Sequence, residues 1–310
     1  MAKFFGEPMP RLLVHAGALL AALVLLGPQA QTTPAQAQNA AASIPNFAPD
    51  PNSSWYPPGP FGDDFLPPES GPGPVMSPPD HPYRPNDLGG QTDAASKPTY
   101  RVADLSNPIL QPWEIEQMKR WNEMALGGEK VPFTARERCY PPGVPAWNVF
   151  RRVAPPMIFF VQTPKIVWMI WRSDMQVRRV YMNVPHSRNP KPTWHGESVG
   201  HYEGDTLVVD TIGLLAHPLS FVDNYRTPHT EQLHVVERFR LTDGGKAMEV
   251  KIHVEDPGAF TTPWNAVQRL ALSTRGPLEE YSCAELGLTP GGDYFGLQAV
   301  PIPQAERPDF

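Results

Sequence analysis

Eight short segments rich in β-branched and aromatic residues fill the second half of the chain, and they constrain its fold most. Gly, Pro, Asn or Asp separates each segment from the next, which favours short antiparallel strands with short links. The segments are 157–162, 166–172, 177–183, 195–202, 206–212, 231–241, 247–254 and 265–272. We expect a mainly β fold, an antiparallel β-barrel or sandwich, and favour a lipocalin-like barrel because closure removes exposed strand edges.

One helix is expected before these strands. Pro112 suits the first helical turn, Glu114 and Glu116 face the positive end of the helix dipole, and Gly127 can end the helix. The sequence therefore predicts a helix over residues 112–126. Its apolar face would consist of Ile115, Met118, Trp121, Met124 and Ala125.

A proline-rich stretch precedes the helix. Residues 45–98 contain 15 of the 40 prolines of the chain. Proline removes a backbone donor and fixes φ, so this stretch is predicted to form an extended arm without regular helix or sheet. Its aromatic residues leave two alternatives open, an arm packed against the domain and an arm that is free.

The N-terminus has the pattern of a secretory signal peptide. Arg11 precedes the apolar run LLVHAGALLAALVLLG, and Ala35 and Ala37 form a small-x-small cleavage site. We expect export to the periplasm or beyond, and no membrane span in the mature chain. The predicted organisation is a signal peptide at 1–37, an extended arm at 38–100, a β-rich domain at 101–290 and a C-terminal tail at 291–310.

The charge balance argues against nucleic acid as a partner. The chain has 26 Lys and Arg against 32 Asp and Glu, a net charge of −6, and no basic block that would follow a phosphate backbone. Cys139 and Cys283 are the two cysteines. An oxidising compartment favours a disulfide between them, and two free thiols are the alternative.

The stretch PTWHGESVGHYEGDTLVVDT, residues 192–211, concentrates reactive residue types. Its G-x-S-x-G pattern resembles a nucleophile elbow, but the sequence continues as turn and strand, which disfavours a serine hydrolase. As a strand it places His195, Glu197 and His201 on one face. If that face lines the barrel lumen, imidazole and carboxylate supply acid–base chemistry; if it meets solvent, it is an ordinary polar face.

A second concentration of polar residues lies between 226 and 239. His229 falls in a turn-like Thr-Pro-His-Thr, and His234 lies within a predicted strand. Glu237 has apolar neighbours and needs a partner, such as Arg238 or a residue across the sheet. A buried ion pair and a catalytic role are equally compatible with this pattern.

The catalytic candidates are thus histidines and one carboxylate, and the substrate-binding candidates are aromatic or hydrogen-bonding residues. The catalytic candidates are His195, Glu197, His201, His229 and His234, and the substrate-binding candidates are Trp168, Trp194, Ser198, Tyr202 and Arg238. A metal site built from the histidines is the less favoured alternative, because no H-E-x-x-H, H-x-H or EF-hand spacing occurs.

Several stretches together resemble a widespread family of secreted bacterial proteins without an assigned function. The stretches that carry this resemblance are DLSNPILQPW, RERCYPPGVP, VRRVYMNVPH, PKPTWHGESVGHYEGDTLVVDTIG, FVDNYRTPHTEQLHVVERFRL and DPGAFTTPW, between residues 104 and 264. The resemblance implies export and one β-rich domain. It implies no catalytic residues.

The functional expectation is an exported, cofactor-independent lyase, isomerase or hydrolase. Histidine and Glu197 would perform acid–base chemistry on a small apolar or aromatic molecule inside the barrel. No nucleotide fingerprint or flavin motif points to an organic cofactor. The alternative is a lipocalin-like carrier of a small hydrophobic ligand, in which aromatic rings hold the ligand and the histidines only complete hydrogen bonds.

Overall fold

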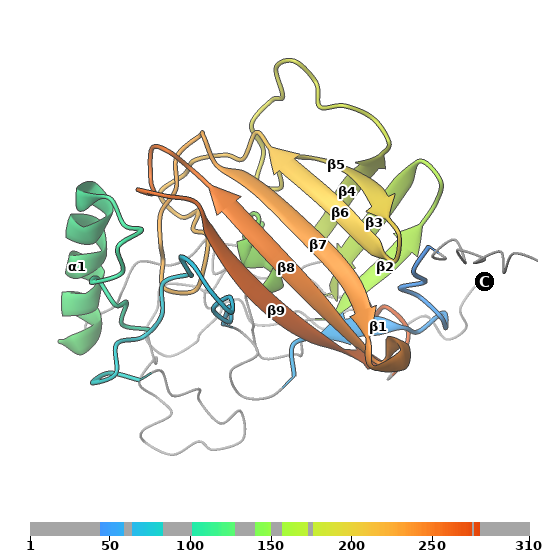
Figure 1. Ribbon diagram of the computed structural model, residues 1–310, viewed down its shortest axis with the longest axis horizontal. Helices are drawn as coiled ribbons and strands as arrows, with labels where there is room; N and C mark the ends of the chain where they lie inside the picture. The colour runs from blue at the N-terminus through green and yellow to red at the C-terminus, as the bar shows by residue number, and fades with distance from the viewer. Residues whose placement is uncertain are drawn as a thin grey trace, which may run out of the picture. The chain divides into compact units, whose positions relative to one another are not determined.

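The computed structural model describes residues 44–58, 64–82, 101–127, 140–149, 157–172, 176–274 and 276–279. In these residues nine strands form one closed barrel in the order β1 to β9 (Figure 1). The strands are β1 Ser54–Tyr56, β2 Ile158–Gln162, β3 Ile166–Trp171, β4 Gln176–Met182, β5 Glu197–Glu203, β6 Thr206–Ile212, β7 His234–Thr242, β8 Ala247–Glu255 and β9 Trp264–Ser273. The predicted mainly β fold is confirmed, as a barrel rather than a sandwich.

The pairing differs from the expectation at β4 and β5, which run parallel. All other neighbouring strands are antiparallel, as predicted. A parallel neighbour needs a crossover instead of a tight turn, and residues 183–196 provide it. The ladder between β4 and β5 contains three residue pairs, Val180 with Ser198 through Met182 with Gly200.

The prediction that the proline-rich arm contains no sheet is wrong. Strand β1 belongs to the arm and closes the barrel by pairing with β2 and β9. Residues 52–56 contain no proline, so their amides are available for a strand ladder. Trp55 is fully buried, and its Nε1 donates to the Phe47 carbonyl at 2.8 Å. These described parts of the arm therefore pack against the domain.

A second part of the arm lies along β9. Leu66 and Val267 exchange backbone hydrogen bonds of 2.8 and 2.9 Å, and the Asn265 amide donates to the Pro72 carbonyl at 3.0 Å. Val75 and Phe65 are buried in the hydrophobic core. The arm thus pairs with the edge of β9 opposite to β8, at residues that the short strand β1 does not reach.

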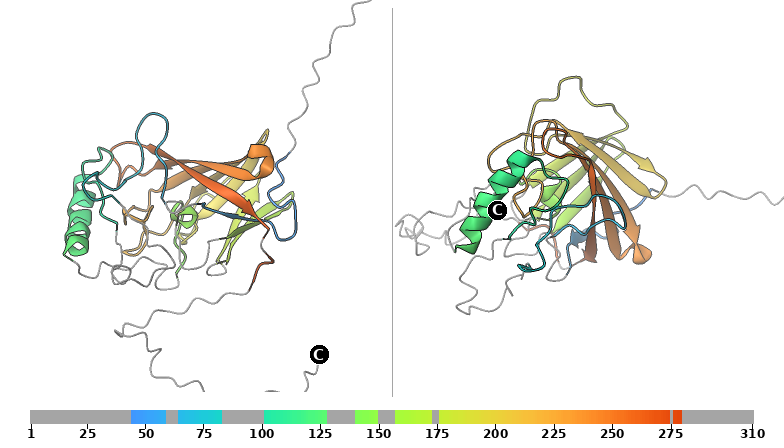
Figure 2. Two further views of the ribbon diagram at one scale, coloured as in Figure 1. Left: turned by 90° about the horizontal axis from the view of Figure 1, so that it is seen from below. Right: turned by 60° about the vertical axis from the view of Figure 1, so that its left-hand side comes forward.

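Helix α1 spans Pro112–Leu126, as predicted. The Gln111 amide donates to Glu114 Oε2 at 2.9 Å, which caps the first turn, and Gly127 ends the helix. Met118 and Trp121 face the core, and the Trp121 ring meets Phe221 edge-on at 5.3 Å. The helix lies beside one end of the barrel (Figure 2). Among the described residues, no helical segment has the length and hydropathy of a membrane-spanning helix.

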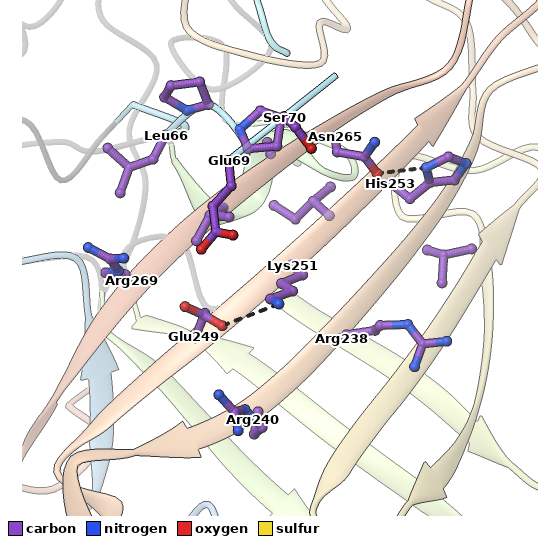
Figure 3. Close-up of a pocket in the computed structure, with 16 residues that line it drawn as sticks. Leu66, Glu69, Ser70, Arg238, Arg240, Glu249, Lys251, His253, Asn265 and Arg269 are labelled. Atoms are coloured by element: carbon purple, nitrogen blue, oxygen red, sulfur yellow. Dashed lines mark hydrogen bonds and ion pairs between the residues drawn. The ribbon is translucent and has the colours of Figure 1, made fainter. Parts of the chain in front are cut away.

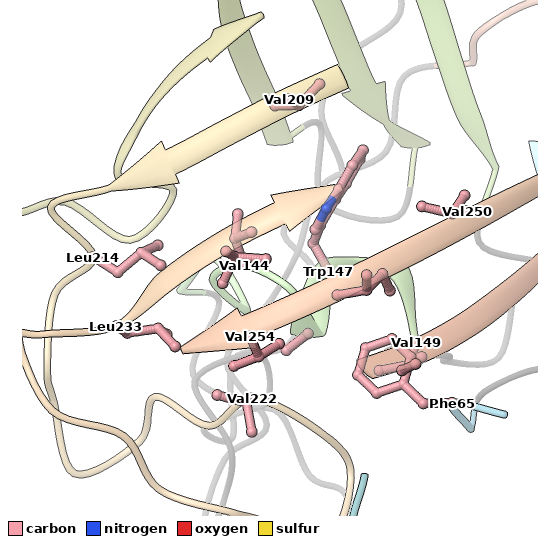
Figure 4. Close-up of a cluster of buried hydrophobic side chains, with 14 of the residues drawn as sticks. Phe65, Val144, Trp147, Val149, Val209, Leu214, Val222, Leu233, Val250 and Val254 are labelled. Atoms are coloured by element: carbon pink, nitrogen blue, oxygen red, sulfur yellow. The ribbon is translucent and has the colours of Figure 1, made fainter. Parts of the chain in front are cut away.

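Alternate residues of the strands fill the barrel interior. Phe160, Phe239 and Met169 point inward and are at most 3% exposed, and the Phe160 and Phe239 rings meet at 6.1 Å. The short helix η2, Ala146–Asn148, carries Trp147 into the same cluster (Figure 4). Most of the strand aromatics therefore form part of the hydrophobic core.

Candidate functional site

A buried ion pair joins Arg178 of β4 and Glu237 of β7 inside the barrel. The side chains are 1% and 0% exposed, and Arg178 Nη2 donates to Glu237 Oε2 at 2.5 Å. Arg178 shares the inward face of β4 with Val180 and Met182, so the period of the strand directs its guanidinium inward. Two charges buried in the barrel interior require further hydrogen bonds, because water cannot solvate them.

Helix η2 supplies part of those bonds. Trp147 Nε1 and Asn148 Nδ2 both donate to Glu237 Oε1, at 3.2 and 2.8 Å. The Arg178 guanidinium also lies 5.1 Å from the centre of the Trp147 ring, a cation–π arrangement. The segment before β2 is therefore held in the barrel by the same carboxylate that balances Arg178.

Two hydroxyl groups complete this cluster. Arg178 Nε donates to Ser198 Oγ at 3.1 Å and Nη2 to Thr211 Oγ1 at 2.8 Å, while the two hydroxyls lie 2.9 Å apart. Ser198 is buried in β5 and does not stand on a strand-to-helix turn. We call the cluster the polar core; it consists of Trp147, Asn148, Arg178, Ser198, Thr211 and Glu237.

The polar core and its neighbour His195 retain unused hydrogen-bonding capacity. Among the described residues, Arg178 Nη1, Asn148 Oδ1 and both ring nitrogens of His195 are buried without a hydrogen-bond partner. Each such group costs about 1–3 kcal/mol. Both donors and acceptors are present, so the cluster is suited to a further small polar group.

His195 stands in a tight turn that leads into β5. The Gly196 amide donates to the Thr193 carbonyl at 3.1 Å, and Gly196 has a φ of +64°. A Cβ at Gly196 would lie 2.5 Å from the Ile212 carbonyl oxygen, so only glycine fits there. This turn brings the imidazole next to the polar core.

The charge state of His195 follows from its surroundings. Burial, and secondly the positive charge of Arg178, lower the pKa of His195 to about 3. The imidazole is therefore neutral at neutral pH, with one nitrogen able to accept a proton. A negative charge placed beside it would raise that pKa again.

A pocket of about 460 Å³ opens on the outer side of the barrel wall next to His195. It lies where β4 extends beyond its short ladder with β5. The lining residues are Pro141, Val177, Arg179, Tyr181, Lys191, Thr193, Trp194, His195, Gly196, Glu197 and Ser198. We call it the His195 pocket. Its apolar and aromatic side chains together with Arg179 and Lys191 suit a small molecule with an apolar body and an anionic group.

Trp194 borders this pocket in an aromatic stack. Its ring lies nearly parallel to Tyr140 at 5.2 Å and 5.1 Å from the His217 ring. Tyr140 and His217 are exposed, so Trp194 is held by rings that themselves meet solvent. Trp194 therefore lies in the wall of the pocket, and its role in substrate binding stays a prediction.

A second constellation runs along the outer face of β5 and β6. His186 Nδ1 lies 3.1 Å from Glu197 Oε1, and His186 Nε2 lies 3.0 Å from Asp210 Oδ1. The Ser187 amide and hydroxyl donate to Glu197 at 2.7 and 2.6 Å. These hydrogen bonds, with that to the Ser187 hydroxyl first, lower the pKa of Glu197.

The same chain of groups continues across β7, β8 and β9. His234 Nε2 lies 2.9 Å from Asp210 Oδ1, and its Nδ1 lies 3.5 Å from Glu255 Oε2. His253 then contacts Glu255 Oε1 at 2.9 Å and Asn265 Oδ1 at 2.8 Å. We call this alternation the outer histidine chain; it consists of Glu197, His186, Asp210, His234, Glu255, His253 and Asn265.

Hydrogen bonding within the outer histidine chain changes its titration. The bond to Asp210 is the main cause of a raised pKa at His234, and the bond to His234 is the main cause of a lowered pKa at Asp210. The bond to His253 lowers the pKa of Glu255. These hydrogen bonds therefore favour the imidazolium form of His234 and the carboxylate forms of Asp210 and Glu255.

The structure does not bring the five catalytic candidates together. Glu197, His201 and His234 point outward from their strands, so a lumenal site built from them is wrong. The reason is register: on β5 the inward positions belong to Ser198 and Gly200. Exposed His201 pairs with Glu203 at 3.0 Å, which in turn pairs with Arg238 at 2.6 Å.

His229 has a structural environment. It is 9% exposed, its Nε2 lies 2.8 Å from Ser220 Oγ, and its Nδ1 lies 2.9 Å from the Thr230 carbonyl oxygen. Burial lowers its pKa and favours the neutral ring that these two contacts can satisfy. Both nitrogens are thus used inside the protein.

Three of the substrate-binding candidates, Trp168, Tyr202 and Arg238, do not line the His195 pocket. Tyr202 stands near the end of β5 that is remote from His195, and its hydroxyl accepts from Gln162 Nε2 at 2.8 Å. Trp168 lies on β3, where the Arg179 guanidinium covers its ring at 5.3 Å. The structure therefore groups Trp194, His195, Glu197 and Ser198 at this pocket. Tyr202, Trp168 and Arg238 lie elsewhere.

Sequence reasoning missed Arg178, His186, Asp210 and Trp147. For Arg178 a signal existed: in the segment VRRVYM it alternates with residues that must face a core. Glu237 was recognised as a group that needs a partner, and that partner is Arg178 rather than Arg238. His186 precedes β5 in an irregular segment, where no periodicity predicts its direction.

The predicted disulfide and the alternative metal site remain to be compared with the structure. Cys139 and Cys283 lie outside the described residues, so the disulfide stays a prediction. Within the described part of the chain, no group of three or more His, Cys, Asp or Glu side chains is arranged to hold a metal ion.

No protein-family model, curated protein or solved structure matches this chain. The resemblance to secreted bacterial proteins therefore stays a prediction. The fold and site geometry define a closed, mainly β barrel with a charged pair in its interior and a pocket in its wall.

Proposed function

We propose that this protein is an exported enzyme that performs acid–base chemistry, without an organic cofactor, on a small molecule in the His195 pocket. The observation that carries the proposal is the neutral imidazole of His195, whose buried nitrogens have no partner among the described residues and which stands beside the buried guanidinium of Arg178. The reaction class is that of an isomerase, lyase or hydrolase.

The roles of the residues follow from their charge. His195 accepts a proton from the substrate. Arg178 stabilises the negative charge that then develops on the substrate. An anionic substrate raises the pKa of His195 on binding, which makes the imidazole a stronger base in the complex than in the free enzyme. Ser198, already hydrogen-bonded to Arg178, positions the reacting group.

The substrate class follows from the pocket walls. Trp194, Tyr181 and Val177 contact an apolar or aromatic body, and Arg179 and Lys191 hold an anionic group such as a carboxylate. The signal-peptide pattern at residues 1–37 supports export of this enzyme to the periplasm or beyond.

Proton exchange tests this proposal without knowledge of the full reaction. Small aromatic and aliphatic carboxylates are first screened by thermal shift, and those that stabilise the protein are incubated with it in D2O and followed by NMR. We expect wild-type protein and His201→Gln to catalyse C–H exchange, and His195→Gln to lose it by about 100-fold or more while ligand binding is retained. His201 is the control because it is an exposed histidine on β5, the strand that follows His195.

Two results would overturn the enzymatic proposal. Exchange that persists in His195→Gln would remove the imidazole from the mechanism. Ligands that bind tightly but show neither exchange nor conversion would favour the alternative, a carrier, for which the aromatic wall formed by Trp194 and Tyr181 is the supporting observation.

A further inference from the structure

A second, larger pocket of about 780 Å³ lies on the outer face of β7, β8 and β9. The arm segment Leu66–Ser70 forms one wall and is fixed by its two backbone hydrogen bonds with Val267. We call this pocket the arm groove. It shares no lining residue with the His195 pocket.

Cationic side chains dominate the floor of the arm groove. The charged lining residues are Arg238, Arg240, Lys251 and Arg269 against Glu69 and Glu249 (Figure 3). This local excess of positive charge stands on a chain whose net charge is −6. A ligand that enters the groove therefore meets a field opposite in sign to that of the whole protein.

The strand register sets these cations beside one another. Arg238 is directly opposite Lys251, and Arg240, Glu249 and Arg269 form one row across three strands. Like charges directly opposite each other destabilise a sheet. Arg238 is compensated by Glu203 at 2.6 Å, and Lys251 lies 3.9 Å from Glu249. Arg240 and Arg269 form no ion pair within the described residues and are exposed.

The spacing of the exposed cations fits a ligand with more than one anionic group. Arg240 and Arg269 lie on strands two apart, about 10 Å across the sheet, and Arg238 and Arg240 lie about 7 Å apart along one strand. A single small anion can contact one of these positions. An oligomer with regularly spaced anionic groups can contact several of them at once.

The other lining groups indicate a hydroxyl-rich ligand. Glu249 and Glu69 would repel a ligand that carries only anionic groups, but they accept hydrogen bonds from hydroxyls. Asn265, His253 and Ser70 add neutral donors and acceptors along the same groove. We infer that the arm groove binds an acidic oligosaccharide, with its carboxylates on Arg240, Arg269 and Lys251 and its hydroxyls on Glu249 and Asn265.

Titration calorimetry with a uronic-acid oligomer tests this inference, with the fully methyl-esterified oligomer and inorganic polyphosphate as comparison ligands. We expect the uronic-acid oligomer alone to bind clearly, with an affinity that falls about tenfold as NaCl rises from about 50 to about 300 mM. Arg240→Gln/Arg269→Gln should weaken binding by about tenfold. The matched control Arg120→Gln/Arg188→Gln removes two exposed arginines elsewhere and should leave the affinity unchanged.

Other outcomes would overturn the inference. Equal binding of the methyl-esterified oligomer would show that charge is not recognised. Polyphosphate that binds as tightly as the uronic-acid oligomer would exclude a role for hydroxyls. No binding of any of the three ligands, in protein whose unfolding transition is intact, would exclude the arm groove as an oligosaccharide site.

Discussion

Arg178 of β4 and Glu237 of β7 form an ion pair inside the barrel, although β5 and β6 lie between their strands. Solvent reaches neither charge. The pair links β4, β7 and helix η2 through one carboxylate. The pair therefore connects the strands of the barrel with helix η2, which enters the barrel interior.

Loss of one partner of this pair should destabilise the protein strongly. Glu237→Gln leaves the Arg178 guanidinium buried without a countercharge, which typically costs about 3–5 kcal/mol. Arg178→Met/Glu237→Leu removes both charges and should recover part of that loss, because apolar groups of similar size need no countercharge. Recovery is incomplete because Trp147 Nε1 and Asn148 Nδ2 lose their acceptor. Urea denaturation of the three proteins measures the difference.

The exposed pair of Arg238 and Glu203 provides the control. Glu203→Gln should change the urea midpoint little, because solvent screens that pair. A midpoint for Glu237→Gln as close to wild type as that of Glu203→Gln would contradict the buried-charge argument.

His195 should make folding sensitive to acid. Its pKa is about 3 in the folded protein against 6.5 when unfolded, so between these values the unfolded chain binds one more proton. Stability then falls as pH decreases through this window, by about 1.4 kcal/mol per pH unit for one proton. His195→Gln should reduce that slope, measured as the free energy of unfolding between pH 4 and 6. A slope equal to that of wild type would show that His195 titrates normally.

The outer histidine chain should stabilise the fold in a limited pH range. The raised pKa of His234 contributes stability that is present below 6.5 and is lost as pH rises through the folded pKa. The lowered pKa values of Asp210 and Glu255 contribute stability that is present above about 4.5 and is lost as pH falls through their folded values.

Consequently His234→Gln should cost most stability near pH 5.5 and least near pH 9. Thermal unfolding across this range measures the effect, and His81→Gln, a change at an exposed histidine, serves as the control. A loss for His234→Gln that is constant with pH would attribute it to packing rather than to charge.

The turn before β5 should depend on glycine. Gly196 and Gly244 both have φ near +60°. A Cβ added at Gly196 would lie 2.5 Å from the Ile212 carbonyl oxygen, whereas a Cβ added at Gly244 would have no heavy atom within 4 Å. Gly244→Ala should cost about 1 kcal/mol from its backbone conformation alone, and Gly196→Ala several times more. Chemical denaturation compares the two variants. Equal losses would exclude the steric contact as the cause.

Local sequence signals predicted most of the secondary structure. Pro112, Glu114 and Gly127 predicted the bounds of α1, and alternation with turn residues predicted β2 to β9 within a few residues. Such signals work because helix capping and strand period depend on neighbours in the chain. Strand β1 was missed because its three residues stand among prolines and become a strand only by pairing with β2 and β9.

For the functional residues, alternation along each strand predicted which side chains share a face. Which of the two faces points inward depends on how the barrel closes. Glu197 and His201 do alternate with Ser198 and Gly200, but barrel closure turned the serine and glycine inward. The pairing of Arg178 with Glu237 joins residues 59 positions apart in the chain. Alternation with a period of two defines two faces of a strand but does not determine which face is buried. Contacts between distant strands depend on the path of the whole chain.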